Sequence, residues 1–282
     1  MNTATIYRHA GLTPLRLVRI KQPGLVLALF VIALAVLCAV APGLLAPYGP
    51  LDADPANRLL APSFQHLFGT DNLGRDVLSR TIHGAVLSLS GATIAVSLGL
   101  SAGVFIGVLA GYGRGLVDAV VMRLIDVLLA VPNLLLSMAI VVTFGFGTWN
   151  AALAVGVASI AVFARLTRAE VLRVRALPYV EAARGSGVGH VGIVFRHILP
   201  NAITPVLGLA ALQFGTAILA IATLGFLGFG TPPPTPEWGL QVAEGRDFLA
   251  FAWWLTTLPG LVIVAVVLSA SRVATEIRRR VR

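Results

Sequence analysis

Charged residues are scarce in this 282-residue chain, at 12% of the total, about half the share that soluble domains usually carry. Hydrophobic residues make up 57% of the chain, and its mean hydropathy is +0.89. A soluble globule of this size needs a polar exterior that such a composition cannot supply. The sequence therefore argues against soluble enzymes and predicts an integral membrane protein, built from spans of about 20 apolar residues.

Lysine and cysteine each occur once, as Lys21 and Cys38. One cysteine excludes an intrachain disulfide. With its one lysine the chain contains no G-x-x-x-x-G-K-[ST] phosphate-binding loop, so an ATPase that drives this protein has to be another chain. The five histidines show no metal-ligand spacing. We therefore expect no catalytic residues, no bound metal and no cofactor in this chain.

Uncharged apolar stretches predict an all-α polytopic membrane protein with about six transmembrane helices. The stretches cover residues 24–45, 85–110, 119–143, 150–164, 203–230 and 250–271. The chain then divides into an N-terminal tail (1–23), a first transmembrane helix (24–45), an external loop (46–83), a core domain (84–272) that includes a cytoplasmic loop (165–201), and a C-terminal tail (273–282).

Basic residues are distributed unequally between the two sides of these spans. Seventeen lie on the side of both tails and of the loop 165–201, and four lie on the other side. The positive-inside rule therefore places both termini in the cytoplasm. This topology accounts for most of the net charge of +9. We expect the lipid bilayer to be the partner of the apolar spans. No basic stripe is interleaved with stacking aromatic residues, so we expect no nucleic-acid partner.

Glycines recur every four residues in the second span, at Gly99, Gly103, Gly107 and Gly111. Residues four apart share a helix face, so another helix can approach this backbone closely. Two interpretations stay open, static packing or a sliding contact in a moving bundle.

The third span begins with charged residues near its cytoplasmic end. Arg123 and Asp126 are three residues apart and can pair on one helix face. Such a pair either anchors the helix at the interface or has a functional role. Pro132 removes a backbone hydrogen bond and should kink this span.

The cytoplasmic loop contains the most specific motif. Residues 181–187 read Glu-Ala-Ala-Arg-Gly-Ser-Gly, and residues 197–200 read His-Ile-Leu-Pro. The spacing predicts two short helices joined by a glycine reversal, the second ending near Pro200. The motif resembles the loop of permease subunits of binding-protein-dependent ABC importers, with His197 where that family has Ile. The resemblance implies a type I importer fold and an ATPase-coupling role for Glu181, Ala182, Ala183, Gly187, His197, Leu199 and Pro200.

A second motif lies before the second span, where residues 68–80 read Phe-Gly-Thr-Asp-Asn-Leu-Gly-Arg-Asp-Val-Leu-Ser-Arg. It resembles the signature of one permease subunit of the dipeptide, oligopeptide and nickel importers. Residues 233–239 and 243–246 fit the same subfamily. We expect Asp71, Arg75 and Asp76 to lie in a short polar helix here and to form a local charge network that holds the outer rim against a partner permease. The signature residues are Gly69, Thr70, Asp71, Gly74, Arg75 and Asp76.

The resemblance implies a complete assembly in a bacterial inner membrane. This chain would form a heterodimer with a homologous permease. Two ABC ATPase subunits that bind ATP and an extracytoplasmic solute-binding protein would complete the assembly. The solute would be a di- or oligopeptide or a related solute such as nickel. An ion-coupled transporter is less consistent with the sequence, because the middle of every span is uncharged. An intramembrane enzyme would need paired polar groups at depth, and only scattered Ser and Thr occur there.

The topology leads to a labelling prediction. In a Cys38→Ala background, cysteine placed at Asp54 should react with an impermeant thiol reagent added outside the cell. Cysteine placed at Arg175 or Arg279 should react only after permeabilisation. External labelling at Arg279 would contradict a fold with six spans and both termini inside.

Overall fold

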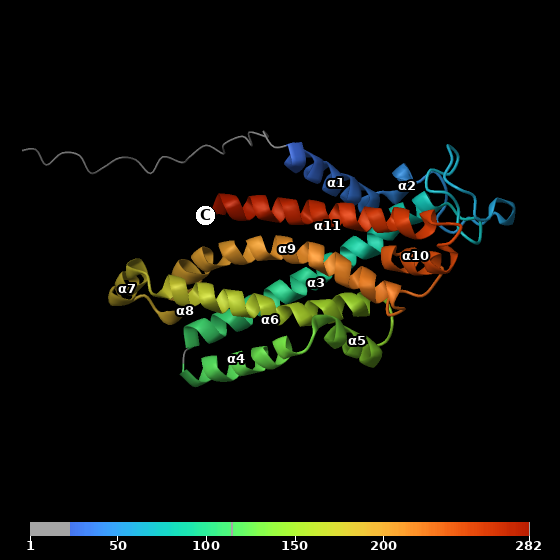
Figure 1. Ribbon diagram of the computed structural model, residues 1–282. Helices are drawn as coiled ribbons and strands as arrows, with labels where there is room; N and C mark the ends of the chain where they lie inside the picture. The colour runs from blue at the N-terminus through green and yellow to red at the C-terminus, as the bar shows by residue number, and fades with distance from the viewer. Residues whose placement is uncertain (1–22, 114, 282) are drawn as a thin grey trace, which may run out of the picture.

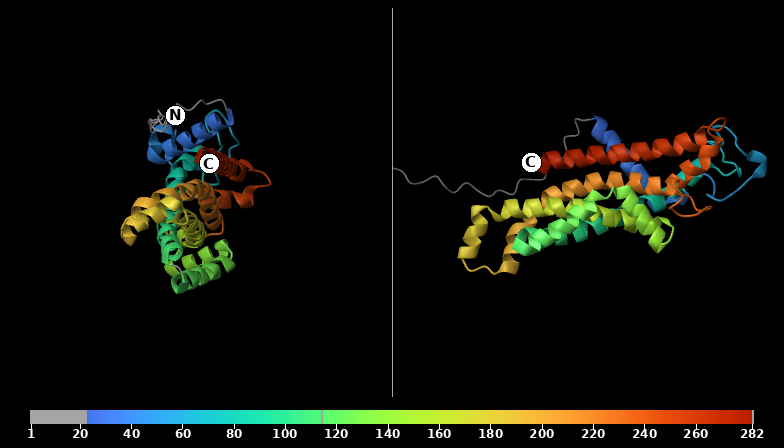
Figure 2. Two further views of the ribbon diagram at one scale, coloured as in Figure 1. Left: turned by 90° about the vertical axis from the view of Figure 1, so that its left-hand side faces the viewer. Right: turned by 60° about the horizontal axis from the view of Figure 1, so that its bottom comes forward.

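The computed structural model describes residues 23–113 and 115–281, so nearly all of the predicted N-terminal tail and Arg114 lie outside the described residues. Long helices run side by side, with short helices at both ends of the bundle (Figures 1 and 2). They are α1 (Pro23–Val40), α2 (Pro42–Leu45), the 3-10 helix η1 (Pro55–Asn57), α3 (Val77–Gly113), α4 (Gly115–Ala130), α5 (Asn133–Phe144), α6 (Thr148–Arg175), α7 (Pro178–Gly185), α8 (His190–Gly192), the π-helix η2 (Ile193–Ile198), α9 (Leu199–Phe226), α10 (Trp238–Gly245), the 3-10 helix η3 (Arg246–Phe248) and α11 (Trp254–Val281).

Five helical segments of the described chain are long and apolar enough to cross a membrane: α1, α3, α6, the continuous helix from α8 through α9, and α11. The remaining predicted span is a pair of helices, α4 and α5, bent by 92°. The all-α fold with about six spans is therefore confirmed, with α4 and α5 together as one broken span. Pro132 causes more than the expected kink, since it disfavours helix at Val131 and stands as the N-cap of α5.

Most of the long helices extend beyond the apolar stretches that predicted them. The helix α3 begins at Val77, so the external loop covers residues 46–76. The helix α6 continues to Arg175 and α11 to Val281, so part of the predicted cytoplasmic loop and C-terminal tail is helical. Arginine is a good helix former, and each added residue gains a backbone hydrogen bond, so a span continues beyond its apolar stretch. The first span is shorter, since Ala41 leaves the helix before Pro42.

The glycine row of α3 packs against α6. All four glycines are buried. A β-carbon on Gly99 would lie 2.8 Å from Cβ of Ser159, and one on Gly107 would lie 2.5 Å from Cβ of Thr167 and 2.7 Å from the carbonyl oxygen of Ala164. No real β-carbon tolerates such distances to backbone atoms. The absence of side chains on this face therefore lets the two helix backbones approach each other closely.

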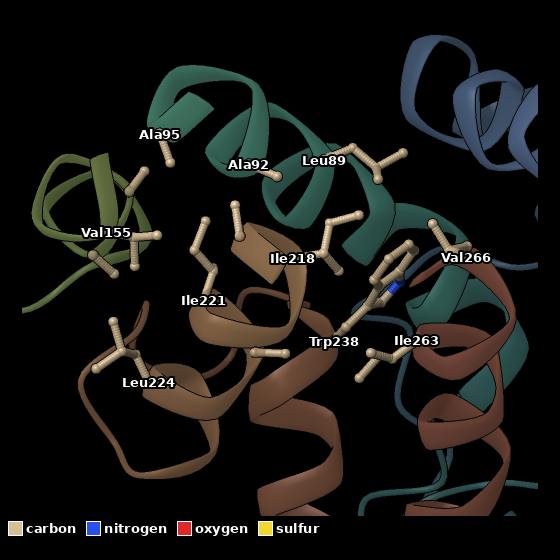
Figure 3. Close-up of a cluster of buried hydrophobic side chains, with 14 of the residues drawn as sticks. Leu89, Ala92, Ala95, Val155, Ile218, Ile221, Leu224, Trp238, Ile263 and Val266 are labelled. Carbon is tan, nitrogen blue, oxygen red and sulfur yellow. The ribbon is translucent and has the colours of Figure 1, made fainter. Parts of the chain in front are cut away.

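The largest buried cluster joins α3, α6, α9, α10 and α11 near the end of the bundle that carries α10. Figure 3 shows the indole of Trp238 among Ile218, Ile263 and Val266, with the small residues of α3 above them. Trp238 is 1% exposed, and its indole N–H donates to the carbonyl oxygen of Thr81 at 2.8 Å. The short helix α10 is thereby fixed between the long helices.

The glycine contact leads to a stability prediction. Gly107→Ala should destabilise the folded protein by about 1–3 kcal/mol, because the added methyl group meets the α6 backbone. Gly260→Ala is a matched control, since nothing lies within 4 Å of its position and both changes add the same helix propensity. Thermal unfolding of the purified proteins measures the difference. Equal unfolding temperatures for the two variants would contradict the close contact.

Candidate functional site

The external signature forms a tight loop, so the expected short polar helix is wrong. Thr70 and Asp76 form an isolated β-bridge, and Oδ1 of Asp71 accepts the backbone N–H groups of Leu73 at 2.8 Å and Arg75 at 2.9 Å. Gly69 and Gly74 have φ of +71° and +80°, a left-handed conformation that favours glycine. The aspartate competes with helix formation by bonding its own neighbouring backbone, so this stretch turns sharply before α3 begins.

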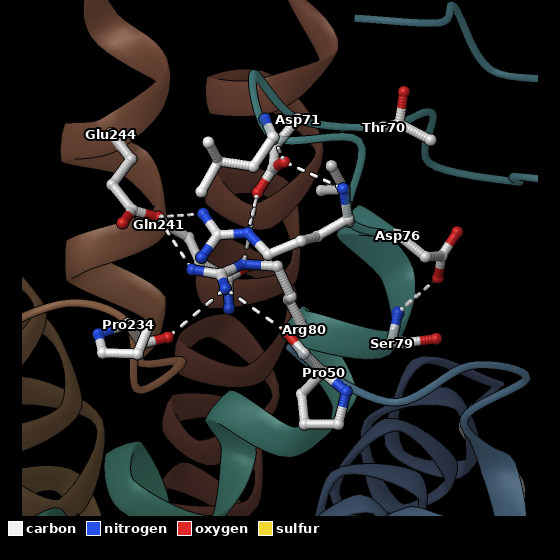
Figure 4. Close-up of polar contacts among 12 residues, drawn as sticks. Pro50, Thr70, Asp71, Asp76, Ser79, Arg80, Pro234, Gln241 and Glu244 are labelled. Carbon is white, nitrogen blue, oxygen red and sulfur yellow. Dashed lines mark hydrogen bonds and ion pairs between the residues drawn. The ribbon is translucent and has the colours of Figure 1, made fainter. Parts of the chain in front are cut away.

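A charge network forms here, but its members differ from those predicted. Arg75 pairs with Asp71 as expected, Arg80 and Glu244 join them, and Asp76 bonds His66 instead. Asp71 accepts from Nε of Arg75 at 2.6 Å, and Glu244 of α10 accepts from Nη2 of Arg80 at 2.8 Å. Arg80 is 2% exposed and also donates to the carbonyl oxygens of Pro50 and Pro234, both at 3.3 Å (Figure 4). The network therefore ties the loop 46–76 and α3 to α10 within this chain. A role in holding the outer rim against a partner permease stays a prediction.

Asp76 caps the start of α3 in the same region. Its Oδ2 accepts the backbone N–H of Ser79 at 2.7 Å, and its Oδ1 lies 2.9 Å from Nδ1 of His66. An aspartate at this position satisfies a helix N–H group and complements the helix dipole. Asp76 thus links the start of a transmembrane helix to the middle of the external loop.

Glu237 caps α10 and is fully buried. Its carboxylate accepts the backbone N–H groups of Gly239 at 3.0 Å and Leu240 at 2.9 Å, and the hydroxyl of Ser88 at 3.0 Å. Burial raises the pKa of Glu237, against the effect of these hydrogen bonds. Arg80, Glu237 and Glu244 stand inside the motifs that carry the subfamily resemblance. Composition and spacing do not assign Arg80 and Glu244 to the charge network, nor Glu237 to the cap of α10.

The predicted glycine reversal of the coupling motif is a complete Schellman motif at the end of α7. The N–H of Gly187 donates to the carbonyl oxygen of Arg184 at 3.0 Å, and the N–H of Val188 donates to that of Ala183 at 3.2 Å. Gly187 has φ of +81°, which confirms the left-handed backbone. Glu181, Ala182 and Gly187 are exposed to solvent, and Ala183 is half-buried.

The second arm of the coupling motif differs from prediction. The helix that starts at His190 does not end near Pro200 but continues through it into α9. The π-helix η2 lies directly before Pro200, where the N–H of Leu199 donates to the carbonyl oxygen of Val194. A proline lacks an N–H, and a π-helical turn is one way in which a helix accommodates the interruption. His197 and Leu199 are half-buried here, and Pro200 is exposed.

Polar contacts hold the segment from α7 to η2 (residues 178–198) to the long helices. The Tyr112 hydroxyl at the end of α3 lies 2.6 Å from Nδ1 of His190. Arg175 at the end of α6 donates to the carbonyl oxygens of Gly111 at 3.2 Å and Tyr112 at 2.8 Å. Tyr179 of α7 donates to the carbonyl oxygen of His197 at 3.0 Å. The Tyr112–His190 contact therefore joins this segment to the end of α3, and the bond from Tyr179 to His197 joins its two arms.

Charged residues of α4 pair across helices, so the predicted Arg123–Asp126 pair is wrong. Asp126 pairs with Arg165 of α6 instead. Asp118 accepts from Nε of Arg168 at 2.5 Å and from Nη2 at 2.6 Å, a bidentate pair. The two pairs hold α4 along α6. The prediction considered only residues on the same helix and therefore missed partners on α6.

A cavity of about 370 Å³ lies between α5, α6 and α9. Its polar lining comes from uncharged side chains. These are Asn133, Ser137, Ser159, Gln213, Thr216 and Thr223. Polar side chains at membrane depth are favoured where they face a water-filled space, so this cavity is a candidate part of a translocation path.

The chain matches known proteins over most of its length. Residues 103–282 match the family described as "Binding-protein-dependent transport system inner membrane component". The di/tripeptide transport system permease protein DppC of Pseudomonas aeruginosa is 42% identical over 251 residues, which cover 87% of this chain and 83% of that protein. The glutathione transport system permease protein GsiD of Escherichia coli O6:K15:H31 is 39% identical over 263 residues, covering 92% and 86%.

The fold also matches solved structures. An inward-facing structure of the MetNI methionine ABC transporter aligns with a TM-score of 0.62 at 18% identity, covering 73% of this chain and 97% of that chain. An amino acid ABC transporter crystallised with histidines aligns with a TM-score of 0.57 at 21% identity, covering 72% and 94%. These likenesses show the type I importer permease fold.

The buried charge network leads to a prediction for Arg75. Arg75→Ala should destabilise the protein by about 3–5 kcal/mol and lower the yield of assembled complex, because it leaves Asp71 buried without its closest cation. Arg246→Ala is the control, since Arg246 pairs with Asp247 on the surface and should matter by less than about 1 kcal/mol. Unfolding temperature and complex yield are measured together. Wild-type values for Arg75→Ala would mean that the network contributes nothing to stability.

Proposed function

Because this chain belongs to the family of binding-protein-dependent transport system inner membrane components, we propose that it carries di- or oligopeptides, or a related solute such as nickel, as half of a heterodimeric path. The chain is the permease subunit of an ABC importer. One observation carries the choice of solute: curated relatives that align with 87% and 92% of the chain are permeases named for di/tripeptide and glutathione transport.

The cavity between α5, α6 and α9 supports this choice. Its polar groups are neutral hydrogen-bonding side chains. Such groups bond the amide backbone of a peptide and hold no fixed counter-charge against its variable side chains. A path of this kind suits a family of related peptides, with selectivity left to the solute-binding protein.

Coupling to ATP would run through the segment 178–198. Two ABC ATPase subunits would bind and hydrolyse ATP and receive Glu181, Ala182 and Gly187 on their surface. This chain would bind no ATP and perform no covalent chemistry. The exposed side chains of Val191, 72% exposed, and Phe195, 65% exposed, give the same segment an apolar surface suited to such a contact.

The arrangement of the ends supports an orientation in the bacterial inner membrane. Figure 1 places α7, α8 and the C-terminal end of α11 at one end of the bundle, and α2, α10 and the loop 46–76 at the other. Together with the excess of basic residues, this supports an orientation with the C-terminus and the coupling segment in the cytoplasm and the signature loop outside. Closure of the ATPases would then move the spans between outward- and inward-facing states.

The coupling role is tested at Gly187. Gly187→Asp should leave the protein inserted but lower uptake by roughly tenfold or more, an effect of about 1.4 kcal/mol. A non-glycine residue at φ of +81° costs about 1–2 kcal/mol, and the exposed carboxylate meets the partner surface. The reconstituted complex is assayed for ATPase co-purification, binding-protein-stimulated hydrolysis and uptake.

Two further variants separate the causes. Gly185→Ala changes a neighbouring exposed glycine that lacks a positive φ, so it should behave as wild type. Gly187→Asn adopts the left-handed conformation more easily than most residues and adds no charge, so it should retain more uptake than Gly187→Asp. Normal co-purification, hydrolysis and uptake in Gly187→Asp would rule out this segment as the coupling element.

A further inference from the structure

The loop 46–76 carries an aromatic side chain that packs on nothing in the described chain. Phe64 is 103% exposed, more than any other large apolar residue that the structure describes. In Figures 1 and 2 this loop lies beyond the ends of the long helices, at the end opposite α7. Leu60, Leu67 and Leu51 of the same loop are 40%, 58% and 50% exposed.

The turn that presents Phe64 is held firmly. The N–H of Ser63 donates to the carbonyl oxygen of His66 at 2.9 Å, which closes the turn. The Tyr48 hydroxyl donates to the carbonyl oxygen of Gln65 at 3.1 Å, and its ring lies 5.0 Å from that of His66. His66 in turn bonds Asp76, the buried cap of α3. The backbone of the turn is therefore linked through His66 and Asp76 to the start of α3.

A fully exposed aromatic residue on a turn whose backbone is held by hydrogen bonds has the character of an interface anchor. Aromatic residues dominate binding energy at protein interfaces, and a backbone that is already ordered loses little further entropy on binding. A turn without a partner gains nothing from this rigidity, since exposing Phe64 to water is unfavourable. Leu60 and Leu67, which lie close to it in the sequence, provide additional exposed apolar area for such a contact.

We propose that the Phe64 turn docks the extracytoplasmic solute-binding protein, which receives the ring in an apolar pocket on its surface. This inference rests on the proposed function, because the family to which the chain belongs is defined by dependence on such a protein. The loop lies beyond the ends of the long helices, on the side that the proposed orientation makes extracytoplasmic. Its attachment to α10 and α3 through Arg80, Glu244 and Asp76 gives the docked protein a direct connection to two elements of the core.

The binding test uses the complete complex in lipid nanodiscs and the solute-binding protein encoded in the same gene cluster. Phe64→Ala should weaken binding of that protein about tenfold or more. Basal ATP hydrolysis should be unchanged, and excess binding protein should restore stimulated hydrolysis. Tyr48→Phe, which removes only the bond to Gln65, should weaken binding less. Leu116→Ala is the control, since Leu116 is an 84% exposed apolar residue in the first turn of α4, outside every surface given a role above, and should leave this affinity unchanged.

A second measurement identifies what surrounds the turn. An environment-sensitive fluorophore is attached to Phe64→Cys in the Cys38→Ala background. A blue shift only after addition of the binding protein supports the proposal. A blue shift in nanodiscs without that protein would overturn it in favour of lipid or the partner permease. If the wild-type complex shows uptake that depends on the binding protein, and Phe64→Ala binds as well as wild type, this inference fails and the proposed function stands. If the wild-type complex shows no such uptake, the proposed function itself fails.

Discussion

The close contact between α3 and α6 is the constraint on which the rest of the structure depends. Four glycines spaced at one helix turn let the two backbones touch, and the opposing residues of α6 fill the space that side chains would otherwise take. In lipid no hydrophobic force distinguishes one apolar surface from another, so association relies on such close packing. The positions of α4, α9 and the short terminal helices are defined relative to this pair.

The helix α3 also connects the two polar ends of the molecule. Its 37 residues span about 55 Å, well beyond the hydrocarbon core of about 30 Å. At one end it is capped by Asp76 and carries Arg80, and at the other Arg175 donates to its last carbonyl groups. The external loop and the coupling segment therefore contact the two ends of one continuous helix.

Much of the candidate site could be predicted from the sequence because its features are local. The left-handed conformation of Gly187 follows from a glycine after a short helix, and the glycine row follows from the helical repeat. Predictions failed where a local rule met a competing interaction. The Asp71 carboxylate accepts the backbone N–H groups of Leu73 and Arg75, which replaces a helix by a turn. The π-turn before Pro200 lets one helix continue where an end was expected.

The sequence by itself determined the membrane class, the approximate spans, the basic side and the coupling motif, because composition and helical periodicity suffice for each of them. Only the tertiary structure decided which charges pair. Asp126 meets Arg165 across 39 residues, and Arg80 meets Glu244 across 164. Such partners come together only once the helices have packed, because the ion pair depends on distance in space, which the separation along the chain does not determine.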